Sequence, residues 1–170
     1  NKEAQYTRIE LEFKKPQLPK DLRGTQVSYM QTLLIELVCD MLNNRLSELA
    51  MQPEATFVGA GSFYGELVKE KDAFTAVYLA KQGQETQAYK DLLIQLEKMR
   101  RYGFTNAELD RVKKDWLAAY EESYNERNTV RNIAYAQEYI RHYLDGAPIP
   151  GIAWEYQMVQ QVLPILTVDM

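Results

Sequence analysis

The sequence has 170 residues, of which 46% are hydrophobic and 26% are charged, and its formal net charge is −4. This length and composition predict a globular chain of one domain, residues 1–170, with a substantial hydrophobic core. The weak negative charge argues against nucleic acid or an anionic membrane surface as a partner. No apolar run reaches the roughly 20 residues of a membrane-spanning helix.

The chain begins with a predicted strand and a long predicted helix. In residues 6–14 apolar side chains alternate with charged ones, which predicts a strand with one face in solvent and favours antiparallel pairing. Residues 21–52 contain apolar residues at the i, i+3, i+4, i+7 spacing of a helix. They therefore predict one amphipathic helix with Asp21 as its N-cap and Pro53 just after its end.

A hairpin is predicted next. Residues 55–68 and 73–80 are rich in strand-forming residues and are separated by a charged turn, so they predict two antiparallel strands. Gly59, Gly61 and Gly65 occur at the same parity in the first of them. Such a run would be costly in a helix and indicates a bend, or the close approach of another part of the chain, on that face of the strand.

The second half of the chain predicts four helices. Thr105 and Glu108 form the T-x-x-E pattern of a capping box at the start of one of them. The predicted helices run from residue 84 to Gly103, from Thr105 onward, from Asn128 or Thr129 to Asp145-Gly146, and over residues 152–163. The whole order predicts an α+β fold, in which a small antiparallel sheet has several helices packed on one face.

Few residues suggest catalytic chemistry. Cys39 is the only cysteine and His142 the only histidine, so the chain has neither an intrachain disulfide nor the paired imidazoles of a zinc site. The two residues lie far apart in the sequence, which argues against a nucleophile and base pair. We expect Cys39 to be buried and His142 to be a surface or helix-capping residue. No catalytic residue, metal ligand or cofactor is predicted in this chain.

Tyrosine is unusually frequent, with 12 residues. Tyr120 and Tyr124 are four residues apart in one predicted helix, and Tyr135, Tyr139 and Tyr143 repeat that spacing in the next. One interpretation is a half-buried stripe whose hydroxyl groups reach water or backbone. The other is an interface, or a wall that lines a peptide chamber, because tyrosine provides contact area at low entropic cost.

Three segments resemble one known family. Residues 41–49, MLNNRLSEL, resemble the M-L-x-x-R-L-x-E-L turn of the insulinase/pitrilysin-type zinc metallopeptidases, with Arg45 and Glu48 at motif positions. Residues 103–113 are similar to the family's G-x-T-x-x-E-L-x-x-x-K helix start, and residues 150–169 also fit its pattern. The resemblance covers nearly the whole chain and is greatest to large bacterial members.

The resemblance implies a particular place in a larger enzyme. Members of the family consist of repeated α+β domains whose two halves close around a peptide chamber, and the zinc-binding H-x-x-E-H motif belongs to the first domain. With one histidine this chain cannot contain that motif. We therefore expect it to be the second, non-zinc-binding domain of a longer multidomain protease. Family domains of the C-terminal half often hold substrate with an arginine and a tyrosine, but the equivalent positions here are Ala50 and Phe57, which cannot donate the hydrogen bond.

The expected function is therefore a non-catalytic domain that supports the zinc domain and forms part of the chamber wall, while the parent protein hydrolyses peptides with zinc. The expected partners are the other domains of the same protease and its peptide substrate, and the expected location is the bacterial periplasm or envelope. Two alternatives remain. One is a peptide- or protein-binding module that uses the tyrosines or an edge of the sheet. The other is an architectural subunit of a relative that lacks zinc.

Overall fold

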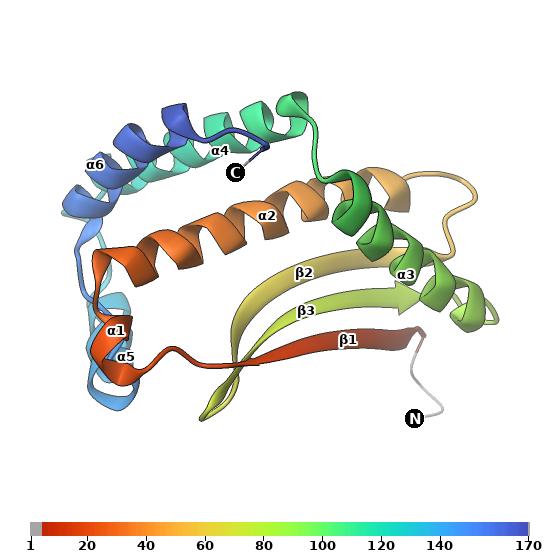
Figure 1. The fold of residues 1–170 in the computed structure, drawn as a ribbon, viewed down its shortest axis with the longest axis horizontal. Coiled ribbons are helices and arrows are strands. Elements are labelled where there is room, and N and C mark those ends of the chain that lie inside the picture. The colour runs from red at the N-terminus through yellow and green to blue at the C-terminus, as the bar shows by residue number, and fades with distance from the viewer. Residues whose placement is uncertain (1–4, 170) are drawn as a thin grey trace. The chain divides into compact units, whose positions relative to one another are not determined.

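The computed structural model describes residues 5–169, and Figure 1 shows the order of their helices and strands. The contacts divide the chain into two compact units. The first contains the chain up to Gln17 together with Leu33–Phe104, and the second contains Leu18–Thr32 together with the chain from Thr105 onward. This division does not test the expectation of one domain cut from a longer protease, which stays a prediction.

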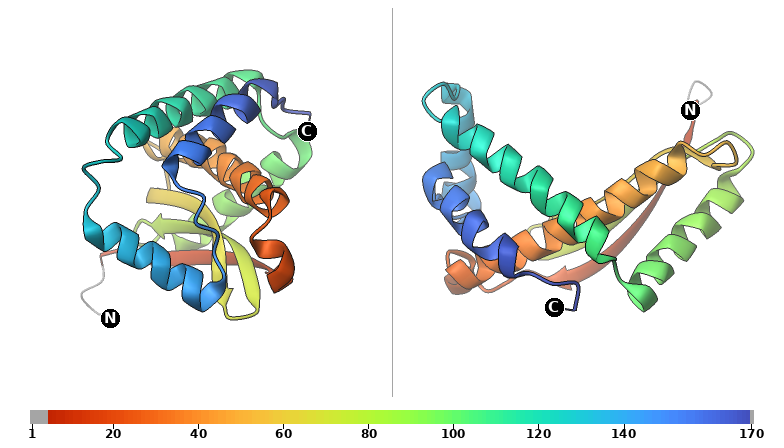
Figure 2. Two further views of the ribbon diagram at one scale, coloured as in Figure 1. Left: turned by 90° about the vertical axis from the view of Figure 1, so that its left-hand side faces the viewer. Right: turned by 90° about the horizontal axis from the view of Figure 1, so that it is seen from above.

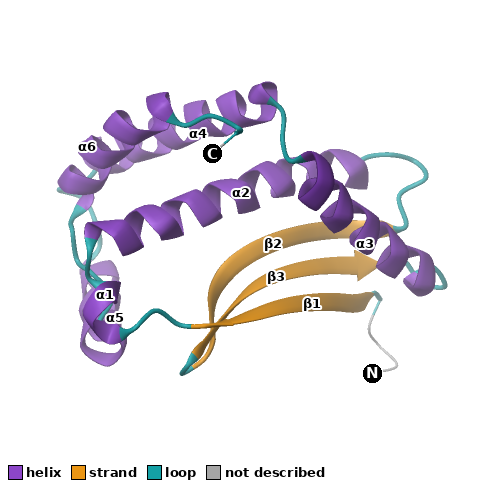
Figure 3. Cartoon of the chain, in the orientation of Figure 1, coloured by secondary structure: helices purple, strands orange, loops and turns teal. Residues whose placement is uncertain are grey.

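The first unit is built on a three-stranded antiparallel sheet (Figure 3). Its strands are β1 (Thr7–Pro16), β2 (Phe57–Val68) and β3 (Lys71–Ala80), in the spatial order β1-β3-β2. The three predicted strands are confirmed. The pairing of β2 with β3 shifts register between Phe57 and Gly59 and again between Glu66 and Val68.

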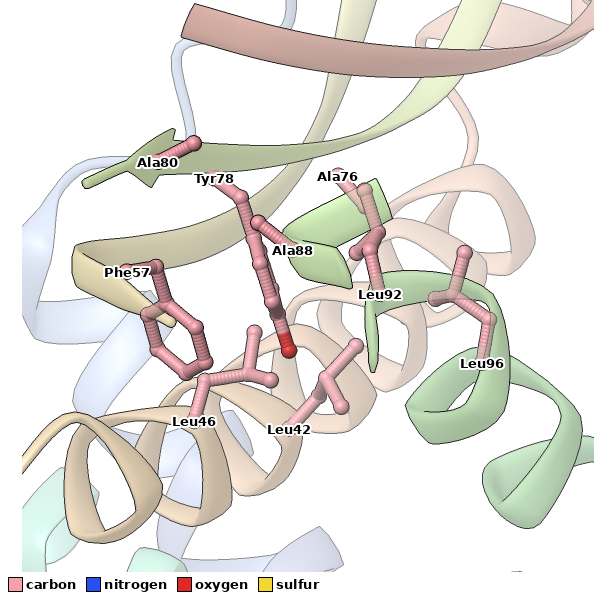
Figure 4. Close-up of a cluster of buried hydrophobic side chains, with 9 residues drawn as sticks. All are labelled: Leu42, Leu46, Phe57, Ala76, Tyr78, Ala80, Ala88, Leu92 and Leu96. Carbon is pink, nitrogen blue, oxygen red and sulfur yellow. The ribbon is translucent and has the colours of Figure 1, made fainter. Parts of the chain in front are cut away.

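Two helices cover one face of this sheet. They are the part of α2 (Gln26–Ala50) that follows residue 32, and α3 (Glu85–Tyr102). Tyr78 of β3 is fully buried at the centre of the core, and its ring lies 4.1 Å from the ring of Phe57. Figure 4 shows the remaining core side chains: Leu42, Leu46, Ala76, Ala80, Ala88, Leu92 and Leu96. The predicted α+β arrangement is confirmed.

The long helix begins later than predicted. Residues Lys20–Arg23 form a separate short helix, α1, and α2 begins only at Gln26. The side chain of Thr25 caps α2, because its Oγ1 accepts a hydrogen bond from the Ser28 N–H at 3.2 Å. The prediction of Asp21 as the N-cap of one continuous helix was therefore wrong, since Asp21 lies inside α1.

The second unit is helical. Besides α1 and the first turns of α2, it contains α4 (Asn106–Asn125), α5 (Asn132–Asp145), α6 (Ile152–Val162) and the 3₁₀ turn η1 (Leu163–Ile165). Figure 2 shows α4 and α6 side by side. Their buried contact is formed by Leu109, Val112, Met158, Val159 and Val162. None of the described helices is long and apolar enough to cross a membrane.

The ends of these helices match the predictions except at the start of α5. The capping box is present, with the Glu108 N–H donating to Thr105 Oγ1 and the Thr105 N–H donating to the Glu108 carboxylate. Gly146 ends α5 in the left-handed conformation. The predicted start of α5 at residue 128 or 129 was wrong. Thr129 instead closes a turn after α4, because its hydroxyl donates to the Glu126 carbonyl at 2.8 Å.

Candidate functional site

The two side chains with the most reactive chemistry are in unreactive settings. Cys39 is only 4% exposed, and burial raises the pKa of its thiol to about 11, so the thiol is protonated and a poor nucleophile at neutral pH. The Nδ1 atom of His142 lies 2.7 Å from the Ala147 carbonyl oxygen, just beyond the end of α5. His142 is therefore the exposed capping residue predicted. Within residues 5–169, no three His, Cys, Asp or Glu side chains are placed to hold a metal ion.

The two segments that carry most of the family resemblance meet in the first unit. Arg45 of α2 donates a hydrogen bond to the Gly103 carbonyl at 3.3 Å, and its guanidinium group lies 4.8 Å from the centre of the Phe104 ring. Gly103 has a φ of +62°, a conformation that glycine adopts without strain. The motif arginine therefore fixes α2 to the point where α3 ends, which is a structural role.

The other motif positions also have structural settings. Phe57 is buried against Tyr78 and lies within the core of the first unit. Ala50 is half-buried in the last turn of α2, and Glu48 is exposed on the same helix. Phe57 is thus turned into the core, and neither it nor Ala50 has a side chain that donates a hydrogen bond.

A contact between α2 and the edge of the sheet was not predicted. Asn43 donates from Nδ2 to the Ser62 carbonyl at 3.0 Å, while its Oδ1 accepts from the Ser62 N–H at 2.5 Å. The Ser62 hydroxyl, which is buried, lies 3.0 Å from the same Oδ1 and 3.3 Å from the Cys39 carbonyl oxygen. Two signals in the sequence were available: a polar residue directly beside the apolar stripe of α2, and the glycine-rich strand that allows another segment to approach.

The five tyrosines differ in their burial and contacts. In α4, the ring of Tyr124 stacks at 5.3 Å on Tyr156 of α6 and lies 4.1 Å from the Arg127 guanidinium, and Tyr120 lies 6.1 Å from another ring, that of Trp116. These two tyrosines are half-buried. The α5 tyrosines are exposed.

Among the α5 tyrosines, Tyr135 turns back to the chain, with its hydroxyl donating to the Arg127 carbonyl at 3.2 Å. Tyr139 and Tyr143 are 59% and 87% exposed.

The apolar side of helix α5 is exposed, as are the other described side chains of this helix except Glu138. Ile133, Ile140 and Leu144 lie on one side of the helix by the 3.6-residue period, and they are 62%, 57% and 65% exposed. Tyr135 and His142, whose side chains bond to the chain itself, lie on the opposite side. A globular helix normally buries its apolar side, so an exposed one marks an interaction surface. We call Ile133, Ile140 and Leu144 the α5 face.

A groove of about 330 Å³ lies within the second unit. Its aromatic wall is Trp154 of α6 with Tyr29 of α2, whose rings meet edge to face at 4.9 Å. The groove is also lined by His142 and by residues 24–26, Gly146 and 148–150. Nearby, burial raises the pKa of the Glu155 carboxyl, with a further contribution from the negative charge of Glu138, while a hydrogen bond from Tyr29 acts in the opposite direction.

Comparison with known proteins identifies the class of protein that has this fold. No family model matches the chain. A segment of 67 residues, 39% of this chain and 7% of the relative, is 33% identical to a zinc protease PQQL-like protein of Arabidopsis thaliana. Among solved structures, the periplasmic protease PqqL of Escherichia coli matches with a TM-score of 0.84 and 18% identity over 99% of this chain and 18% of that one.

Two further structures agree. A predicted insulinase family protease of Yersinia pestis matches with a TM-score of 0.82 and 13% identity over 98% of this chain and 35% of that one. A peptidase M16 inactive domain of Pseudomonas fluorescens matches with a TM-score of 0.59 and 13% identity over 95% and 36% of the two chains. The chain thus has the fold of the insulinase-type, or M16, peptidase domains, and the resemblance seen in the sequence is confirmed.

The chain spans a small part of the proteins that it matches. The aligned segment covers 7% of the Arabidopsis relative and 18% of the E. coli protease. The chain is therefore a zinc-protease-related domain by its fold.

Proposed function

We propose that this chain is a non-catalytic domain of a zinc-dependent metallopeptidase, in which it supports the zinc-binding domain and forms part of the peptide chamber wall. The zinc site would lie in a preceding domain of the parent protein, because this chain has one histidine and a zinc peptidase needs several ligands. The match to the first half of E. coli PqqL, with a TM-score of 0.84 over 99% of this chain, supports a place in the N-terminal half of such an enzyme.

The α5 face is the observation that supports this role most directly. Three large aliphatic side chains on one side of one helix remain exposed, and such a surface becomes stable when a partner covers it. The matched structures belong to much longer chains, so the proposed partner is another domain of the same polypeptide. Tyr139 and Tyr143 on the same helix would then contact that domain or the peptide in the chamber. Tyr120 contacts Trp116 within α4, and Tyr124 stacks on Tyr156 of α6, so these two tyrosines would stabilise the unit that contains α5.

The proposed location is the bacterial periplasm. The E. coli relative is a periplasmic protease.

The proposal is tested by adding this chain to a parent protein that lacks it and measuring peptide hydrolysis. The parent protein without residues 1–170 should hydrolyse peptides poorly, and adding the wild-type chain should restore a chelator-sensitive activity. The double variant Ile140→Asp, Leu144→Asp should restore at least about tenfold less activity, because two carboxylates are then placed in the apolar contact. Met51→Asp is a matched control, since Met51 is 83% exposed in the first unit and lies outside the α5 face.

Two results would contradict the proposal. If the double variant restores activity as well as the wild-type chain does, the α5 face does not contact the rest of the enzyme. If the isolated chain binds one equivalent of zinc in calorimetry, or cleaves peptides by itself, the non-catalytic role is wrong.

A second candidate function is a peptide-binding module, which the groove beside Trp154 and Tyr29 favours. Aromatic walls of this kind bind extended peptides in other proteins. Titration of the isolated chain with unstructured peptides would distinguish the two candidates, since micromolar binding at the groove supports the module. An architectural role in a relative without zinc is tested by the parent gene, where an H-x-x-E-H motif upstream would exclude it.

A further inference from the structure

A small cavity in the first unit has the features of a built binding site. Its volume is about 170 Å³, which is below the usual range for drug-sized ligands and suits one amino-acid side chain. It lies between the end of α2, the start of β2 and α3. The lining residues are Leu49, Gln52, Glu54, Ala55, Thr56, Phe57, Tyr78, Asp91 and Gln95.

The first feature is a buried hydroxyl group without a protein partner. Tyr78 lines the cavity and is fully buried, and its hydroxyl makes no hydrogen bond with the described residues. Figure 4 shows this hydroxyl at the end of the ring far from β3, next to Leu42 and Leu46 of α2. Buried hydroxyl groups nearly always have a partner, because an unpaired one is unfavourable. Because the hydroxyl is covered, a guest in the cavity reaches it only when neighbouring side chains move aside.

The second feature is a carboxylate that hydrogen bonds hold in place. The Asp91 carboxylate accepts hydrogen bonds from the Thr56 hydroxyl at 2.6 Å and from the Gln87 amide at 2.9 Å. These two bonds orient the carboxylate and leave further acceptor capacity on its oxygens. Glu54 adds a second carboxylate, and no lysine, arginine or histidine lines the cavity.

The lining has a third feature, its apolar residues. Leu49, Phe57 and Tyr78 line the cavity together with its polar residues. A guest with an aliphatic stem and a positively charged end matches this combination, because the stem covers the apolar surface and the nitrogen reaches the acceptors. A carboxylate guest would be repelled by Asp91 and Glu54.

We propose that this cavity binds the side chain of a lysine or arginine, with its cationic nitrogen donating hydrogen bonds to the Asp91 carboxylate and the Tyr78 hydroxyl oxygen. The side chain belongs either to an incoming peptide or to another segment of the parent protein. This inference does not depend on the peptidase role, because it concerns only residues of the first unit.

The test uses the isolated 170-residue chain, labelled with ¹⁵N, and N-acetyl-lysine-N-methylamide as the probe. The amide signals of Gln52, of residues 54–57 and of residues 91–95 should shift on titration, with a Kd in the millimolar range, as expected for one side chain. The norleucine analogue has the same stem without the charge and should bind at least about tenfold more weakly. Equal binding of the two probes, or no binding of either, overturns the proposal without requiring any variant.

Variants then show which side chains of the cavity accept hydrogen bonds from the cationic nitrogen of the probe. Asp91→Asn should weaken probe binding by about tenfold or more, and Tyr78→Phe by about two- to tenfold, since the first removes a charged acceptor and the second a neutral one. Asp110→Asn is the matched control, because Asp110 is exposed on α4 in the second unit. The affinity of this variant for the probe should stay within about twofold of the wild-type affinity. A folded Asp91→Asn variant that binds the probe as the wild type does would refute the site.

The parent protein distinguishes the two sources of the side chain. If the probe binds both the parent and the isolated chain, the site is open and receives a side chain of an incoming peptide. If it binds the isolated chain alone, a segment of the parent already fills the cavity. Either result supports the site and identifies its occupant.

Discussion

Replacing Asn43 by alanine tests the contact that joins α2 to the edge of the sheet. In the native chain, the Asn43 amide binds both the N–H and the carbonyl group of Ser62. Alanine keeps the helix, because it has the higher helix propensity, but it removes both bonds. The Ser62 backbone groups then remain in a partly buried position without their partner, and the buried Ser62 hydroxyl loses one of its two neighbours.

The expected loss of stability follows from these contacts. Each hydrogen bond contributes about 0.5 to 1.5 kcal/mol net, and a buried group left without a partner costs about 1 to 3 kcal/mol. Allowing for partial access of water to Ser62 in the variant, we expect Asn43→Ala to lower the free energy of unfolding by about 2 to 3 kcal/mol. With an m value of about 2 kcal/mol per molar urea, the midpoint should fall by about 1 to 1.5 M.

Urea unfolding followed by far-ultraviolet circular dichroism measures this loss. Asn44→Ala makes the same chemical change one residue further along α2, where the side chain forms no hydrogen bond with residues 5–169, and should cost less than about 0.5 kcal/mol. Asn43→Asp should fall between the two at neutral pH, because its carboxylate still accepts from Ser62 but cannot donate to the carbonyl group. If Asn43→Ala costs no more than Asn44→Ala, the contact does not stabilise the fold and the reasoning is wrong.

Three other predictions concern single side chains. Tyr78→Phe should leave stability unchanged or raise the melting temperature of the isolated chain by a few degrees, since it removes an unpartnered buried hydroxyl; a clear loss in calorimetry would show that the hydroxyl has a partner. Thr105→Ala should cost about 1 kcal/mol in urea unfolding by removing the cap of α4, and an unchanged midpoint would count against the capping box. The pKa of Glu155 is raised in the folded chain, mainly by burial. The folded chain therefore binds the proton of this carboxyl more tightly than the unfolded chain does. The resulting gain in the free energy of unfolding is complete below the ordinary pKa of about 4.5 and is lost as the pH rises through the raised pKa of the folded chain. Glu155→Gln should remove this pH dependence, and identical pH–stability profiles of the two proteins would contradict the assignment.

Local patterns in the sequence were sufficient for most elements but not for every boundary. The alternation in β1, the capping box of α4 and the glycine after α5 depend on residues close together in the chain, and each was predicted. The start of α2 was not, because its apolar pattern begins several residues inside the helix and does not mark the first turn. The sequence analysis named only Asp21 as N-cap, whereas the hydrogen bond from the Ser28 N–H to Thr25 Oγ1 shows that Thr25 has this role.

The candidate sites depend on packing that periodicity alone does not specify. The spacing of Ile133, Ile140 and Leu144 predicts an apolar side of α5, but the same spacing fits a side that faces inward or outward. The contact of Asn43 with Ser62 requires the position of α2 relative to β2, and the cavity beside Tyr78 requires the positions of three elements. Arg45 was recognised from its motif, whereas its contact with the Phe104 ring is visible only in the structure.

The Asn43 amide also affects how the sheet can grow. A primary amide presents one N–H donor and one carbonyl acceptor side by side, as the peptide group of an adjacent strand would, so at Ser62 a helix side chain imitates the missing neighbour of β2. Any extra strand laid along β2 must first expel this amide, which protects that border against unwanted association with other chains. The other edge strand, β1, ends in the sequence Lys14-Lys15-Pro16, whose charges and proline disfavour pairing there. The middle of β1 remains the place where another polypeptide can extend the sheet.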